Sequence, residues 1–247
     1  MYLNLSSSDG EHSWDAKLGA SVGLYRFEGL WSIDLGSEIE LVATPDNDIH
    51  FQPRVFYWQE SLFAMRRDGS LDWGLGYYHR CRHDVDNIAE ENAFAQVLER
   101  VCIWDSLSLR AYPRPLEWSW MGGLSGSARL TLDEHYYVLL QDSVPGQYAG
   151  RSVSLEDLVD TLAVGLVAEP LRWKAAAWYL AVKEYTDFYR ASGGASVSAD
   201  VLAETGVALR GRGSSLEAFA RYERFAETLV DPWRQAGEYL TLGLRAN

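Results

Sequence analysis

The chain has 247 residues and is poor in the features that mark several common protein classes. Its two cysteines, Cys81 and Cys102, are too few for a disulfide scaffold, and their spacing alone does not pair them. The best apolar run, residues 175–182, is less than half the roughly 18 residues that a membrane helix needs. The amino terminus lacks the charged start, apolar centre and cleavage site of a secretory signal, so we expect a mature or truncated chain.

Basic residues are also scarce. The 22 Lys and Arg face 35 Asp and Glu, which gives a net charge of −13. A protein that binds nucleic-acid phosphates presents clustered Lys and Arg instead. We therefore expect no nucleic-acid partner.

Aromatic residues and a two-residue alternation of apolar and polar positions are what the chain does have. It contains 10 Trp and 14 Tyr, side chains that favour membrane interfaces. In residues 14–24, Trp, Ala, Leu and Val alternate with Asp, Lys, Gly and Ser. Similar alternation occupies residues 31–41, 117–127, 200–210 and 239–245. This period is typical of strands that have one apolar face.

The length of these segments separates two all-β folds. Strands of a soluble sandwich usually span about 5–6 residues, whereas a tilted membrane strand needs about 9–11. The alternating segments match the longer class. The sequence therefore predicts one domain over residues 1–247, a transmembrane antiparallel up-and-down β-barrel of about 12 strands in a bacterial outer membrane.

Connection lengths predict the orientation, because such barrels have short periplasmic turns and longer external loops. Short turns are expected near residues 28–29, 67–70, 113–115, 169–172 and 211–214. Longer loops are expected near residues 44–51, 83–99, 132–156, 190–196 and 230–235, with 132–156 forming an external hairpin. Residues 2–5 are interpreted as the remaining end of a first strand, which gives twelve strands and a periplasmic carboxyl terminus. The final Asn247 departs from the usual terminal aromatic residue.

One segment places polar residues on a lipid-facing row. In LDWGLGYYHRCRHDVDN, residues 71–87, strict alternation puts His79 and Cys81 on the same face as apolar side chains. Asp105 falls in the apolar row of the next strand. With a near-symmetric loop, Asp105 lies beside His79 and Cys81 stands opposite Cys102. Polar residues facing lipid are costly and tend to be functional, and these three types form a nucleophile, base and orienting acid. The same alternation opposes a disulfide, because it puts Cys102 on the lumen face.

The stretch YHRCRHDVDN, residues 78–87, resembles the Tyr-His-x-Ser-x-His motif of an uncharacterised family of outer-membrane barrels. RVCIWDSLSL, residues 100–109, resembles the strand that follows in that family. More loosely, His-x-Ser on an outward strand is similar to outer-membrane phospholipase A and the lipid A deacylase. The resemblance implies a lipid esterase or deacylase with His79 as base, Cys81 as nucleophile and Asp105 as orienting acid. Cys81 stands where these families have serine, and Arg82 and His83 replace the phospholipase's asparagine and glycine.

Such an enzyme has membrane lipid or lipopolysaccharide as its partner, with the barrel assembly machinery as a second partner. Other interpretations remain open. His79 and Cys81 could simply pack among lipid headgroups, or join His83 in a transition-metal site. No cofactor is required, although the acidic loops at residues 46–48 and 84–87 could hold calcium. The rival function is a narrow pore or structural barrel. Its expected lumen row is Asp34, Glu38, Glu40, Lys183, Glu204, Arg210, Arg221 and Glu223.

Overall fold

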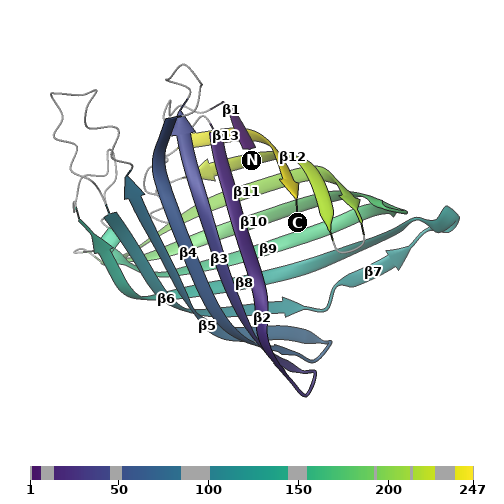
Figure 1. Cartoon of the computed structure of the whole chain (residues 1–247), viewed down its shortest axis with the longest axis horizontal. Coiled ribbons are helices and arrows are strands. Elements are labelled where there is room, and N and C mark those ends of the chain that lie inside the picture. Colours follow the sequence, from purple (N-terminus) through teal and green to yellow (C-terminus); the bar gives the residue numbers. More distant parts are fainter. Residues whose placement is uncertain are drawn as a thin grey trace.

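A computed structural model describes residues 2–6, 14–44, 52–84, 101–143, 155–191, 194–211, 214–225 and 237–246. The described chain is almost entirely β-structure (Figure 1). The strands are β1 (Tyr2–Ser6), β2 (Trp14–Phe27), β3 (Trp31–Thr44), β4 (Gln52–Arg67), β5 (Leu71–Asp84), β6 (Val101–Pro113), β7 (Leu116–Ser119), β8 (Ser125–Asp142), β9 (Leu158–Trp173), β10 (Ala176–Ala191), β11 (Gly194–Arg210), β12 (Ser215–Phe225) and β13 (Gly237–Ala246). Two short 3₁₀ turns, η2 (Met121–Gly123) and η3 (Leu155–Asp157), interrupt them. In this described part, no helix has the length and apolarity to cross a membrane.

The strands form one antiparallel meander in which neighbours in sequence are neighbours in space. Strand β1 pairs with both β2 and β13. Strand β6 pairs with β8, from Cys102 opposite Asp142 to Ala111 opposite Leu132. The four-residue β7 is therefore not placed between them and pairs with β8 alone. Apart from β7, the described residues thus form a twelve-strand meander (Figure 1). The predicted all-β, up-and-down, twelve-strand order is confirmed.

Alternate residues of each strand face opposite sides of the sheet. In β13, Leu240, Leu242 and Leu244 are exposed, whereas Tyr239 and Thr241 are buried. We call the side that carries the exposed apolar residues the outer face and the side that carries the buried residues the inner face. This is the arrangement that the two-residue period predicts.

The inner face is charged, and its side chains pair along the wall. Glu204 of β11 accepts hydrogen bonds from Tyr179, Arg221 and Arg245. Of the predicted lumen row, Glu40, Glu204 and Glu223 are buried. Arg210 is exposed and pairs with Glu169, and the other members of the row are half-buried.

The assignment of residues 117–127 to one strand is wrong. The chain reverses inside this segment, so that Leu116 of β7 lies opposite Ala128 of β8. Gly122 and Gly123 make the reversal with φ values of 79° and 78°, a backbone region that other residues rarely adopt. Consequently residues 132–142 are part of the full strand β8, and the predicted external hairpin at 132–156 is also wrong. Alternation continues on both sides of the reversal, so the pattern alone conceals it.

Two connections also differ from expectation. The turn predicted at residues 169–172 lies inside β9, because Pro170 is accommodated at a register shift rather than ending the strand. The chain turns instead at Lys174, whose φ is 52°. The loop predicted at 190–196 is short, since Ala191 pairs with Gly194.

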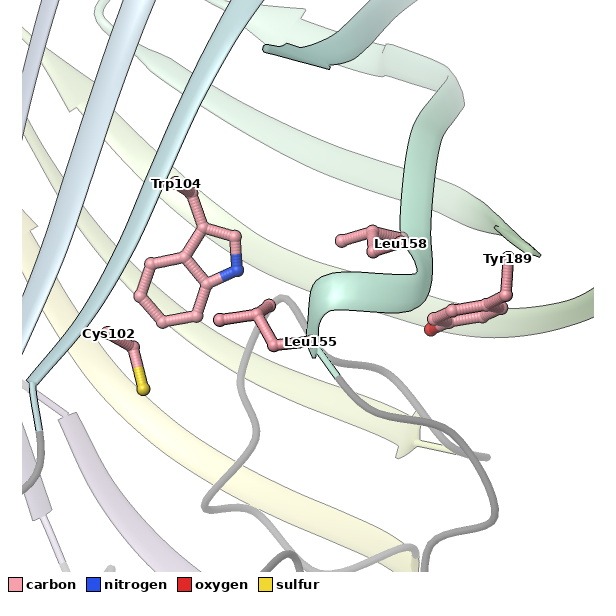
Figure 2. Packing of buried hydrophobic residues seen from close by; sticks show 5 residues of the cluster. All are labelled: Cys102, Trp104, Leu155, Leu158 and Tyr189. Atoms are coloured by element: carbon pink, nitrogen blue, oxygen red, sulfur yellow. The ribbon is translucent and has the colours of Figure 1, made fainter. Parts of the chain in front are cut away.

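The turns that join β2 to β3, β4 to β5, β9 to β10 and β11 to β12 lie at one end of the sheet, which we call the short-turn end, and β13 also ends there, whereas β10 joins β11 at the opposite end. In the turn between β4 and β5, the Asp68 carboxylate accepts hydrogen bonds from the backbone N–H groups of Ser70 and Leu71 and from the Ser70 hydroxyl. These bonds favour the charged carboxylate and hold the pKa of Asp68 below its ordinary value. Near the opposite end, an apolar cluster packs on the inner face (Figure 2).

Candidate functional site

Polar side chains interrupt the apolar outer face where β4, β5 and β6 lie side by side. His79 of β5 stands directly opposite Asp105 of β6. Both positions belong to otherwise apolar rows, which include Leu75 and Leu107 as exposed members. Each strand presents its residue toward the end away from the short turns, because β5 begins at the short-turn end and β6 runs toward it. The predicted neighbourhood of His79 and Asp105 is therefore present.

The imidazole and the carboxylate are in direct contact. His79 Nδ1 lies 2.5 Å from Asp105 Oδ1. The Asp105 side chain is 12% exposed and that of His79 is 30% exposed. The Tyr77 hydroxyl hydrogen-bonds to the same carboxylate. Asp105 thus fixes the ring orientation and leaves Nε2 as the nitrogen that can exchange a proton with a reacting group.

Cys81 is the next residue of β5 after His79 that lies on the outer face. Two residues along a strand advance the chain by about 6.6 Å, which puts the thiol and the imidazole on one patch of the outer face. Cys81 is half-buried, lies between Trp58 and Ile103 on the neighbouring strands, and has a backbone hydrogen bond with Trp58. Its thiol is free.

The expectation that Cys81 stands opposite Cys102 is wrong by one residue, because Arg82 is the partner of Cys102. Neither cysteine is in a disulfide, and Cys102 is fully buried on the inner face beside Trp104 and Leu155 (Figure 2). The two thiols therefore lie on opposite sides of the sheet, as the alternation predicts.

Glu60 is a functional candidate that the sequence analysis missed. It stands opposite His79 on β4, so that carboxylates flank the imidazole from both neighbouring strands. Trp58 Nε1 donates a hydrogen bond to Glu60 Oε1 at 3.0 Å. The alternation of the sequence contains a signal for this residue. Glu60 interrupts an apolar outer row that contains Trp58 and Leu62, just as Asp105 interrupts the apolar outer row of β6.

A β-bulge adjoins the site on its other side. The pairing of β6 with β8 shifts between Asp105 and Ser106, which leaves Val138 without an opposite residue. Val138 and Leu139 are consequently both exposed. A hollow of about 300 Å³ lies along this segment. Bulges are frequent beside active sites because they redirect side chains.

Comparisons with protein-family models, with curated proteins and with solved structures find no match. Among the described residues, no three His, Cys, Asp or Glu side chains gather as a metal site, and this applies to the set of His79, Cys81 and His83. The predicted calcium loop at 46–48 lies outside the described residues, and so does all of the loop at 84–87 except the backbone of Asp84.

The inner face carries a second candidate region. Two cavities of about 470 Å³ each lie there, and Lys17, Gln59 and Arg110 line both. One of them, which we call the central cavity, is lined from β2, β4, β5, β6, β8, β9 and β10. His135 lines it, and its Nδ1 lies 2.8 Å from the Ser108 hydroxyl. Ser108 is buried and does not line the cavity, so it orients the imidazole rather than meeting a ligand.

Proposed function

We propose that the chain is a β-barrel that spans the outer membrane of a bacterium. Pairings of β6 with β8 and of β1 with both β2 and β13 support closure, since they give each of the twelve strands two neighbours. The exposed apolar residues of the outer face support contact with lipid, because a soluble monomer rarely exposes a large continuous apolar surface. A polar inner face and four short turns at one end of the sheet fit the same architecture.

We further propose that this barrel hydrolyses acyl esters of membrane lipids. The observation that carries the proposal is the 2.5 Å contact between His79 Nδ1 and Asp105 Oδ1 on a largely apolar outer face. A structural ion pair gains little on such a surface, whereas a base and its orienting acid there meet lipid esters directly. The resemblance of residues 78–87 to His-x-Ser motifs of barrel esterases points the same way.

The chemistry follows from the order of groups on this patch. His79 Nε2 takes the proton of the Cys81 thiol as sulfur attacks the ester carbonyl. The tetrahedral intermediate collapses to a thioester, and the imidazolium gives its proton to the departing alcohol. Water, deprotonated by the same imidazole, then attacks the thioester, the C–S bond breaks to release a fatty acid, and the imidazolium returns its proton to the Cys81 sulfur. Asp105 holds the ring in place and stabilises the imidazolium throughout.

Mass spectrometry of phospholipid and lipopolysaccharide incubated with the refolded protein tests the proposal. We expect free fatty acid and the matching lyso-lipid from the parent chain, with and without added calcium. Cys81→Ala is expected to remove the release because it removes the nucleophile. Cys81→Ser is expected to retain part of it, because a hydroxyl stands at this position in the motif.

Undiminished release from a correctly folded Cys81→Ala variant would exclude Cys81 as the nucleophile. Its matched control is Ser106→Ala, which removes a buried inner-face hydroxyl close to Asp105 in sequence. No release by the parent under any condition would reject the hydrolase.

A narrow passage for solutes is the second candidate function. The observation in its favour is that the two inner cavities share Lys17, Gln59 and Arg110, so they adjoin inside the sheet. Trp104 lines the central cavity, and Leu155 packs against Trp104 in the apolar cluster of the inner face (Figure 2). We expect Leu155→Ala to raise the single-channel conductance in planar bilayers if the passage conducts. Equal conductance of parent and variant, or the absence of current from both, would reject a passage limited at this cluster.

A further inference from the structure

The central cavity carries a concentration of positive charge that contrasts with the chain as a whole. Four cationic side chains line it, and Asp133 is the one carboxylate among the lining residues, although the chain has a net charge of −13. The cations are Lys17, Arg80, Arg110 and Lys183. Lys17 and Arg80 have Glu40 as a partner at 2.9 and 3.6 Å. Charges of one sign in a cavity with walls of low dielectric constant attract a ligand of the opposite sign.

Two of these cations, Arg110 and Lys183, share one acidic partner. Both contact a single carboxylate, Asp133, with N···O distances of 3.4 and 3.5 Å. Asp133 also accepts a hydrogen bond from the Tyr112 hydroxyl at 3.0 Å. One carboxylate thus serves two cations and a phenol, which leaves the pair with an excess of positive charge. The Arg110 atom in this contact is Nε, which is buried and meets Asp133 without hydrogen-bond geometry.

Aromatic rings hold these cations in position. The Arg110 guanidinium lies 3.8 Å from the centre of the Phe63 ring, and Lys183 Nζ lies 4.7 Å from that of Tyr185. Tyr112, His135 and Tyr185 also line the cavity, which adds polar ring groups and flat surfaces. A guanidinium, an ammonium and hydroxyl groups around one space suit a phosphate, and ring faces suit a sugar-sized body.

We infer that the central cavity binds a small organic phosphate, of about the size of a sugar phosphate. Its volume of about 470 Å³ lies within the roughly 300–1,000 Å³ that is usual for small-ligand sites. The dianionic phosphate lies between Arg110 and Lys183, and the organic part lies against the tyrosines. This site is on the inner face and is independent of the hydrolase on the outer face.

Equilibrium dialysis of the folded chain in detergent micelles against radiolabelled glucose 6-phosphate tests the inference. We expect saturable binding that inorganic phosphate displaces and that unphosphorylated glucose does not. Arg110→Gln and Lys183→Gln should each weaken the binding by about 10- to 100-fold, the range for loss of a charged hydrogen-bonding partner. Lys183→Arg should retain binding, because it keeps the charge.

The matched control is Lys174→Gln, which removes a cation from the exposed turn between β9 and β10. Folding of each variant is checked by its electrophoretic mobility. If Arg110→Gln does not fold, the comparison of the affinities of Lys183→Gln and Lys183→Arg tests the inference by itself. Absence of binding, displacement by glucose, failure of phosphate to compete, or equal affinity of parent and Lys183→Gln would each overturn the inference. None of these variants alters the outer-face site, so a failure here is separate from a failure of the hydrolase.

Discussion

Asp105→Asn is expected to lower the kcat of acyl release by about 10²- to 10⁴-fold while KM changes by less than about 3-fold. The amide removes the negative charge that faces His79 Nδ1 at 2.5 Å, and it can hold the ring in the wrong tautomer. Substrate binding depends on the apolar face around the site and should survive. His79→Ala is expected to cause at least as large a loss, because it removes the base itself. Initial rates over a range of lipid concentrations in mixed micelles measure both parameters.

Asp72→Asn is the matched control for this prediction. It makes the same substitution on β5, but its carboxylate pairs with Arg129, away from His79. We expect its kcat to stay close to that of the parent. Glu60→Gln distinguishes the two carboxylates that flank His79. If Glu60→Gln costs more than Asp105→Asn, the orienting role belongs to Glu60 and the assignment of Asp105 is wrong.

Val182→Arg is expected to reduce the free energy of unfolding by about 2–4 kcal/mol when the protein is folded into lipid vesicles. Val182 lies near the middle of β10, is 49% exposed on the outer face, and stands between Leu166 and Ala203. In the proposed barrel this position faces the hydrocarbon centre, where a charge is most costly. Guanidinium titrations of parent and variant in vesicles of phosphatidylcholine measure the difference.

Leu209→Arg supplies the control, because Leu209 is 54% exposed near the short-turn end of the adjacent strand β11. There the expected cost falls to about 0–1 kcal/mol, since the charge reaches the headgroup region. On a soluble protein, both substitutions would stay within about 0.5 kcal/mol. Equal and small effects at the two positions would therefore contradict the membrane assignment.

Alternation carried most of what could be predicted of the candidate site. It placed His79, Cys81 and Asp105 on one face and Cys102 on the other, because side chains of a strand alternate strictly. It did not decide the register. In an antiparallel ladder without a bulge the two paired residue numbers have a constant sum, so His79 opposite Asp105 puts Ile103, not Cys102, opposite Cys81. The two expected pairings were therefore incompatible, and only the assembled sheet chose between them.

Strand boundaries were less predictable where the pattern and the backbone disagree. Residues 117–127 alternate well, yet two glycines reverse the chain within them. Pro170 looked like the end of a strand, yet a register shift accommodates it within β9. Alternation records which side a residue faces and not whether the chain has turned, and a proline at a register shift does not end a strand.

The sequence by itself determined the all-β class, the twelve-strand order, the apolar outer face and the shared face of His79, Cys81 and Asp105. These properties follow from local rules, namely the two-residue period and the position of turn residues. The tertiary structure alone decided the 2.5 Å contact of His79 with Asp105, the position of Glu60 opposite His79, and the sharing of Asp133 by Arg110 and Lys183. These contacts join residues on different strands, so they depend on register and on the curvature of the sheet, which no single segment specifies.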